Sequence, residues 1–129
     1  MAMINSGNQQ LILQAMVSMA SADGEADSDE IAAIRSVYAN ETGEDISTRD
    51  VTQAAAMLRA SSESLSSVLS SANATMDKPV KEVLLKASYL VLLADGRVAA
   101  RERKRLQDFA NALKISEIHL SVILEDVSS

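Results

Sequence analysis

Acidic side chains are concentrated in two stretches of the chain that repeat one pattern. Residues 22–30 read Ala-Asp-Gly-Glu-Ala-Asp-Ser-Asp-Glu and residues 94–102 read Ala-Asp-Gly-Arg-Val-Ala-Ala-Arg-Glu, so each has a Glu six positions after the glycine. Carboxylate oxygens are the ligands that hard divalent cations prefer. The sequence therefore predicts Ca²⁺, Mg²⁺ or Mn²⁺ as the candidate cofactor, with no other cofactor, and the candidate metal ligands are Asp23, Asp27, Glu30, Asp95 and Glu102.

A purely structural explanation of the repeat stays open at this point. Glycine supplies the backbone freedom that a tight turn between helices needs, and an Asp before it can hydrogen-bond its own backbone. An EF-hand loop is not expected, because only its second half fits, with Asp23 and Glu30 at its fifth and twelfth positions. Its first and third positions would fall on Met19 and Ser21, where a calcium loop needs its own oxygen ligands.

The two copies differ in their electrostatic surroundings. Residues 23–30 hold five acidic residues, whose mutual repulsion favours a divalent cation or a basic partner. If the two loops lie close together, basic residues around the second copy neutralise the first and remove its need for a metal. If they lie apart, the first loop is the better metal candidate. The basic residues concerned are Arg97, Arg101, Arg103, Lys104 and Arg105.

Helices are expected to position both copies. Residues 11–22 and 79–94, which precede the two copies, are apolar on most sides. This pattern is typical of buried helices, so we expect these two helices to pack together at the centre of the fold.

An amphipathic helix is expected to follow each copy. Asp27 and Glu30 have the spacing of a capping box, in which each side chain satisfies the other residue's backbone N–H, and Gly43 is placed to stop this helix. In the second copy the corresponding cap is Ala99, a poor cap residue, so Glu102 loses its reciprocal partner.

Three further helices complete the predicted fold. Two of them join the repeats and one ends the chain; they are expected at about 47–58, 65–76 and 116–127. The fold class predicted is all-α, with about seven helices in a compact bundle built from two pseudo-symmetric halves. The chain is expected to form one domain over 1–129, with half-repeats around 8–43 and 79–114 joined by two helices at about 47–76.

Composition supports this fold class and excludes several functions. Apolar residues make up 47% of the chain, with one Pro and four Gly, which favours helices. The absence of cysteine excludes disulfides and zinc–thiolate sites. Residues 1–77 carry 3 Arg against 11 acidic residues, within a net charge of −6, and the chain has no Trp and one Phe. It therefore lacks the basic stripe and stacking platforms of a nucleic-acid-binding protein.

No enzyme and no membrane insertion are predicted. The single histidine, His119, lies early in the last expected helix, and no nucleophile, glycine-rich or cofactor motif accompanies the carboxylates. The longest apolar stretch, 83–94, has about 12 residues, whereas a membrane span needs about 20. Residues 1–10 lack the charge and hydropathy pattern of a signal peptide. We therefore expect a cytoplasmic protein.

The repeated Ala-Asp-Gly-x-x-x-x-x-Glu, each copy between an apolar and an amphipathic helix, resembles the TerB-like family. That family includes a tellurite-resistance protein and the N-terminal domain of the DjlA co-chaperone. The resemblance covers nearly the whole chain and is most specific over 84–113, where Asp95, Val98 and Glu102 are in register. In the first copy Ala26 replaces the usual larger apolar residue.

The resemblance implies a helical bundle with internal pseudo-symmetry, in a bacterial cytoplasmic protein of the tellurite or chemical-stress response. It also implies a protein partner, which is membrane-associated in this family. Our first hypothesis is a non-enzymatic module that binds a divalent cation or a basic protein surface through its acidic Asp-Gly loops, mainly the first. The alternative is a structural adaptor without a metal site, in which these loops are only turns and an exposed helical face contacts the partner.

Overall fold

A computed structural model describes residues 6–20, 27–95 and 100–128, and this part of the chain contains seven α-helices and no strand. The prediction of an all-α bundle is therefore confirmed. Three short connections without a helix, at 43–47, 61–64 and 113–116, link described helices. The helices are α1 (Ser6–Ala20), α2 (Ser28–Thr42), α3 (Thr48–Ala60), α4 (Leu65–Ala72), α5 (Lys78–Asp95), α6 (Ala100–Ala112) and α7 (Glu117–Ser128), with a 3₁₀ turn at Asn73–Thr75 after α4.

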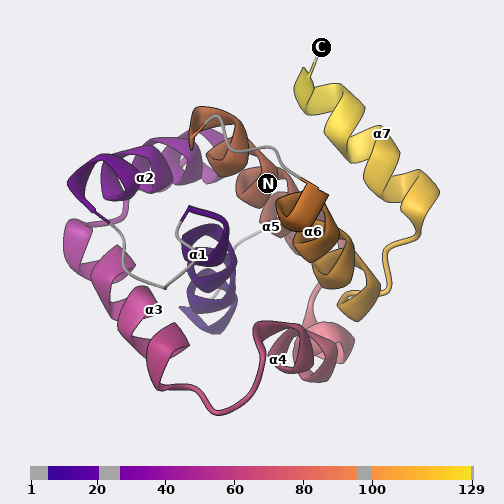
Figure 1. Cartoon of the computed structure of the whole chain (residues 1–129), viewed down its shortest axis with the longest axis horizontal. Coiled ribbons are helices and arrows are strands. Elements are labelled where there is room, and N and C mark those ends of the chain that lie inside the picture. The colour runs from indigo at the N-terminus through magenta and orange to yellow at the C-terminus, as the bar shows by residue number, and fades with distance from the viewer. Residues whose placement is uncertain (1–5, 21–26, 96–99, 129) are drawn as a thin grey trace.

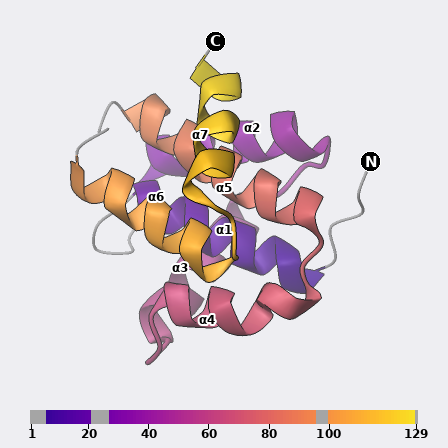
Figure 2. The same cartoon turned by 90° about the vertical axis from the view of Figure 1, so that its right-hand side faces the viewer.

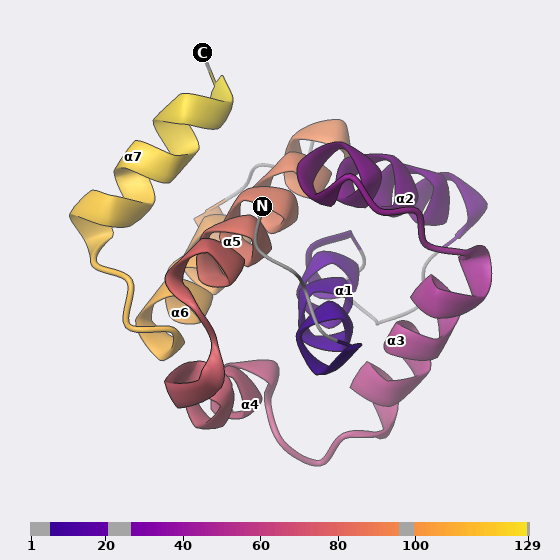
Figure 3. The same cartoon turned by 180° about the vertical axis from the view of Figure 1, so that it is seen from behind.

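Helix α1 occupies the centre of the bundle. Figure 1 shows it almost end-on, with the other helices arranged around it and α7 on the outside. The side chains of Ile12, Leu13, Met16 and Val17 are fully buried, so α1 contributes a nearly all-round apolar surface. Its most extensive packing is against α5, as predicted, and α3 is its next neighbour. The view from behind shows the same enclosure (Figure 3).

The first turns of α2 and α3 are fixed by hydrogen bonds that the sequence predicts. Ser47 caps α3, where its hydroxyl accepts from the Asp50 N–H at 3.1 Å and the Asp50 carboxylate accepts from the Ser47 N–H at 2.9 Å. Helix α2 has an equivalent box at its start and ends at Gly43, whose φ of 76° is left-handed and suits glycine. Helix α2 thus begins and ends at the predicted residues, and α3 begins where a helix was expected, at about residue 47.

Helix α4 is shorter than the predicted helix over 65–76. It ends at Ala72 and continues as a 3₁₀ turn, so Met76 is buried but lies beyond the helix. Ser64 precedes the helix as its cap, with its hydroxyl accepting from the Ser67 N–H at 3.2 Å. Ser62 also lies before the helix begins.

Helix α7 lies outside the ring and packs on α5 and α6 (Figure 2). It begins after Ser116, whose hydroxyl accepts from the His119 N–H at 3.1 Å, as a cap would. Leu120 and Ile123 are buried. Ile118 and Val122, by contrast, are 80% and 57% exposed, so these two apolar residues contribute nothing to the core.

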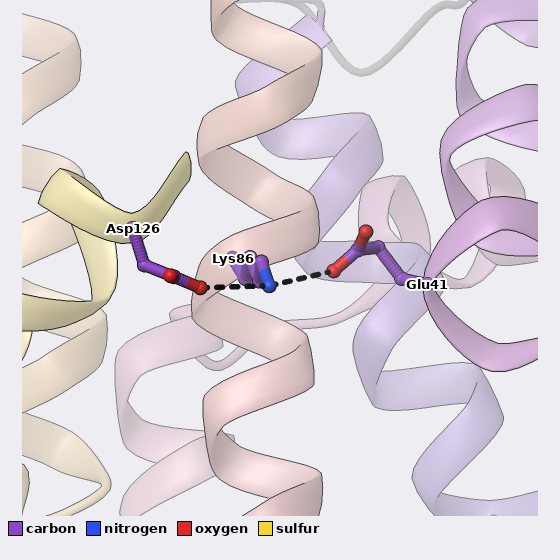
Figure 4. Close-up of polar contacts among 3 residues, drawn as sticks. All are labelled: Glu41, Lys86 and Asp126. Atoms are coloured by element: carbon purple, nitrogen blue, oxygen red, sulfur yellow. Dashed lines mark hydrogen bonds and ion pairs between the residues drawn. The ribbon is translucent and has the colours of Figure 1, made fainter. Parts of the chain in front are cut away.

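Lys86 links α5 to α2 and to α7 through two ion pairs. From α5, its ammonium lies 3.6 Å from a Glu41 oxygen of α2 and 3.3 Å from an Asp126 oxygen of α7 (Figure 4). Burial lowers the pKa of Lys86, but the charges of Glu41 and Asp126 outweigh this effect and raise it above 10.5. A second polar contact of α7 with α5 joins His119 Nε2 to a Glu82 oxygen at 2.9 Å.

Candidate functional site

Three of the five predicted metal ligands have side chains in the described part of the chain. These are Asp27 and Glu30 at the start of α2, and Glu102 in the first turn of α6. Asp23 lies outside the described residues. Asp95 is the last residue of α5, but its side chain also lies outside the described part.

Asp27 and Glu30 form the predicted capping box. Asp27 Oδ1 accepts a hydrogen bond from the Glu30 N–H at 2.8 Å, and Glu30 Oε1 accepts one from the Asp27 N–H at 3.0 Å. The pair thereby satisfies two backbone donors at the helix start, next to the positive end of the helix dipole. Each carboxylate therefore has one oxygen committed to helix formation.

Glu102 occupies the equivalent place in the second copy, but its carboxylate is in a different situation. The side chain is partly buried, and Oε2 is buried without a hydrogen-bond donor from the part of the chain that the structure describes. A carboxylate oxygen that loses water without gaining a donor is energetically costly. A cation would remove this cost. The two copies thus differ chemically: Glu30 Oε1 accepts from a backbone N–H of its own helix start, whereas Glu102 Oε2 has no donor among the described residues.

The structure does not assemble the described carboxylates into one site. No three Asp, Glu or His side chains among the described residues lie close enough to share a metal ion. Helices α2 and α6, which begin with these carboxylates, are separated around the ring by α5, which packs against both (Figure 1). The distance between the two Asp-Gly loops, which decides between shared and separate sites, involves residues outside the described part.

Arg101, Lys104 and Arg105 of α6 line a pocket shared with residues of α1 and α4, whereas Arg103 lines another. Arg105 Nη1 donates to the Ser18 carbonyl oxygen at 2.5 Å, at the C-terminal end of α1. A cation is favourable there, because helix C-termini expose unpaired carbonyl groups. Lys104 pairs with Asp108 at 3.8 Å within its own helix. Neutralisation of the first loop by these residues remains a prediction, since that loop lies outside the described residues.

Sequence reasoning missed several polar contacts made across the fold, among them the ion pairs of Lys86. The Arg105 bond to Ser18 joins residues 87 positions apart, and the His119 bond to Glu82 joins residues 37 positions apart. Neither partner is identified by a local motif. His119 was expected early in the last helix, and it lies in the first turn of α7 with a partly buried ring.

In the described part of the chain, no helix combines the length and the apolar content that a bilayer span needs. A family model described as "Tellurite resistance protein TerB" matches residues 9–123. No curated protein and no solved structure matches the chain.

Proposed function

This chain belongs to the TerB family. From that premise we propose that it is a non-enzymatic binding module of a tellurite or other chemical-stress response. In this proposal its second Asp-Gly loop holds a divalent cation. The observation that supports the cation is the buried Oε2 of Glu102, which has no donor in the described part of the chain. Glu102 is the anchoring ligand in this proposal, and Asp95, whose side chain lies outside the described residues, is the second candidate ligand.

The number of protein ligands favours Mg²⁺ or Mn²⁺ over Ca²⁺. Calcium takes six to eight oxygen ligands, whereas Mg²⁺ keeps several waters and is commonly held by one or two carboxylates. Mn²⁺ is also suited to carboxylate and water ligands. Two carboxylates therefore fit a hydrated Mg²⁺ or Mn²⁺, bound weakly enough to respond to its concentration.

The first loop has a secondary place in this proposal. Asp27 and Glu30 are engaged in the capping box, which accounts for their presence without a ligand. Their charges, with that of Asp23 four residues before Asp27 in the sequence, suit cations or a basic protein segment, with less support than the second loop has.

Calorimetry with Mg²⁺, Mn²⁺ and Ca²⁺ tests the proposal. We expect saturable binding of Mg²⁺ or Mn²⁺ at one site, and a Glu102→Gln variant that does not bind. Glu30→Gln is the matched control: it changes the equivalent residue, and glutamine at this position retains a capping box. Absence of binding up to about 10 mM, beyond the weakest range of protein calcium sites, would count against the cation.

A structural adaptor is the second candidate, and α7 supplies its supporting observation. Ile118 and Val122 lie one helical turn apart and are 80% and 57% exposed. Such a pair on an outer helix suits contact with another protein. If Ile118→Ser/Val122→Ser leaves the fold intact and abolishes capture of a partner while Glu102→Gln does not, the adaptor is favoured over the cation-dependent module.

A further inference from the structure

A cavity of about 350 Å³ lies where the end of α1, the start of α4 and one face of α6 meet. It is separate from the proposed cation ligands. Its lining combines three cationic side chains, three serines, one carboxylate and two apolar residues: Arg101, Lys104, Arg105, Ser18, Ser64, Ser66, Asp108, Leu65 and Phe109.

The positive charge of this cavity follows from the sequence of α6. Arg101, Lys104 and Arg105 are spaced i, i+3 and i+4, so they lie on one face of the helix. Arg103 does not line this cavity and lines a different one. Three cations face one carboxylate here, although the whole chain has a net charge of −6. Such a concentration of one sign in a concave site attracts a ligand of the opposite charge.

The existing contacts of the three cations leave them able to bind an anion. The side chain of Lys104 is 78% exposed and its 3.8 Å pair with Asp108 is long, so little free energy is lost when it changes partner. Arg101 is exposed and forms no ion pair with the described residues. Arg105 is held by the Ser18 carbonyl through Nη1, which fixes the direction of its guanidinium.

The opposite wall of the cavity offers neutral hydrogen-bond donors. The Ser64 hydroxyl caps α4 by accepting from the Ser67 N–H. The N–H groups of Leu65 and Ser66, in the first turn, have no acceptor within the helix. They add to the charges of α6, because the start of a helix is favourable for an anion. The floor is apolar, since Leu65 and Phe109 are 8% and 2% exposed.

We propose that this cavity binds the phosphate group of a small organic phosphomonoester. Arginine and lysine supply charge-assisted hydrogen bonds to phosphate oxygens. The Ser18 and Ser64 hydroxyls already donate to the Ala15 carbonyl oxygen and to Ser67 Oγ, so Ser66 is the serine that adds a hydroxyl donor. The volume exceeds that of a phosphate ion and lies at the lower end of the range for small-molecule sites. Leu65 and Phe109 are placed to contact the organic part. This binding is independent of the cation proposed above.

Nuclear magnetic resonance titrations of the ¹⁵N-labelled full chain at constant ionic strength test the proposal. Three probes separate the sources of the phosphate: inorganic phosphate, phosphoserine and phenyl phosphate, with serine as the uncharged-side-chain control. We expect the amide signals of Leu65 and Ser66 to shift saturably with all three phosphates. Phenyl phosphate should bind several-fold more tightly than inorganic phosphate, because its ring contacts the apolar floor.

Matched variants on α6 locate the site. Arg101→Gln/Lys104→Gln should weaken phenyl phosphate binding about tenfold or more, the effect of losing charge-assisted hydrogen bonds. Arg103→Gln changes the net charge of the same helix without touching the cavity and should alter the affinity less than twofold. Both variants are on exposed positions, and circular dichroism checks their folding.

Three results would overturn the proposal. The first is no saturable shift at Leu65 and Ser66 with any of the three phosphates. The second is an equal loss of affinity in Arg103→Gln, which would indicate diffuse attraction to the helix. The third is tighter binding of inorganic phosphate than of phenyl phosphate, which would exclude an organic ligand in this cavity.

Discussion

Replacement of Asp27 tests whether this residue stabilises the fold as the N-cap of α2, apart from any role as a metal ligand. Asp27→Ala removes the acceptor of the 2.8 Å hydrogen bond from the Glu30 N–H, whereas the backbone N–H of residue 27, which donates to Glu30 Oε1, is retained. Loss of an N-cap costs about 0.5–2 kcal/mol of the free energy of unfolding. Both capping bonds are solvent-exposed, so water replaces the lost acceptor, and we expect about 1 kcal/mol rather than the upper value. The melting temperature should fall by about 3–5 °C in a domain of this size.

Two variants make the reasoning refutable. Asp27→Asn retains a good cap residue without the charge and should recover most of the lost stability. Asp29→Ala removes a neighbouring exposed charge that forms no capping box and should have the smaller effect of a helix-dipole interaction alone. Urea unfolding followed by circular dichroism at 222 nm, at pH 7, measures all three. The cap account is refuted if Asp27→Asn is as unstable as Asp27→Ala, or if Asp27→Ala is no less stable than the parent.

The remaining predictions concern three other residues. Lys86→Met should lower the free energy of unfolding by less than about 1 kcal/mol, because the ion pairs to Glu41 and Asp126 are partly exposed. Since the folded-state pKa of Lys86 is raised, its contribution to stability is complete below pH 10.5 and is lost as pH rises through the folded-state pKa. Urea unfolding from pH 7 to 11 measures this loss. Tyr38→Phe should raise the free energy of unfolding by about 1 kcal/mol in the same assay, because the buried hydroxyl forms no hydrogen bond of good geometry within the described part of the chain. Burial raises the pKa of Tyr38 above 10.0, so the parent loses stability above that pH as the unfolded tyrosine ionises. The variant should lose less stability than the parent over the same pH range. Ser64→Ala should cost about 0.5–1 kcal/mol through loss of the α4 cap, and thermal unfolding with Ser62→Ala as the control checks it.

Most of the fold could be predicted because its signals are local. The capping box at Asp27, the stop at Gly43 and the apolar runs of α1 and α5 each depend on residues a few positions apart. Helix α4 was predicted too long, since the spacing of Met76 also fits a residue that is buried beyond the helix end. Apolar spacing identifies burial more securely than it identifies helix length.

The candidate site could be predicted only in part, because long-range contacts decide it. The sequence placed Glu30 and Glu102 at equivalent positions and identified the weak cap of the second copy. It favoured the first loop, however, on the number of its acidic residues. Which loop binds a cation stays a prediction. Our proposal turns to the second because Glu30 Oε1 accepts from a backbone N–H, whereas the buried Oε2 of Glu102 has no donor among the described residues. Charge density in a sequence does not reveal which carboxylate is already hydrogen-bonded.

The surroundings of the basic residues of α6 could likewise not be predicted from the sequence. The helical spacing of Arg101, Lys104 and Arg105 places them on one face, but their proximity to Ser18 and Ser64 depends on how α1 and α4 pack on α6. No local pattern contains that information. The cavity therefore appears only when residues from three helices are brought together.

Paramagnetic broadening by Mn²⁺ tests the central claim, a cation at the second Asp-Gly loop, most directly. In ¹⁵N-labelled protein, substoichiometric Mn²⁺ should broaden the amide signals of Ala100, Arg101 and Glu102 most strongly. The effect should persist in Glu30→Gln and disappear in Glu102→Gln. Broadening centred on Ser28 and neighbouring residues of α2, or unchanged broadening in Glu102→Gln, would contradict the account.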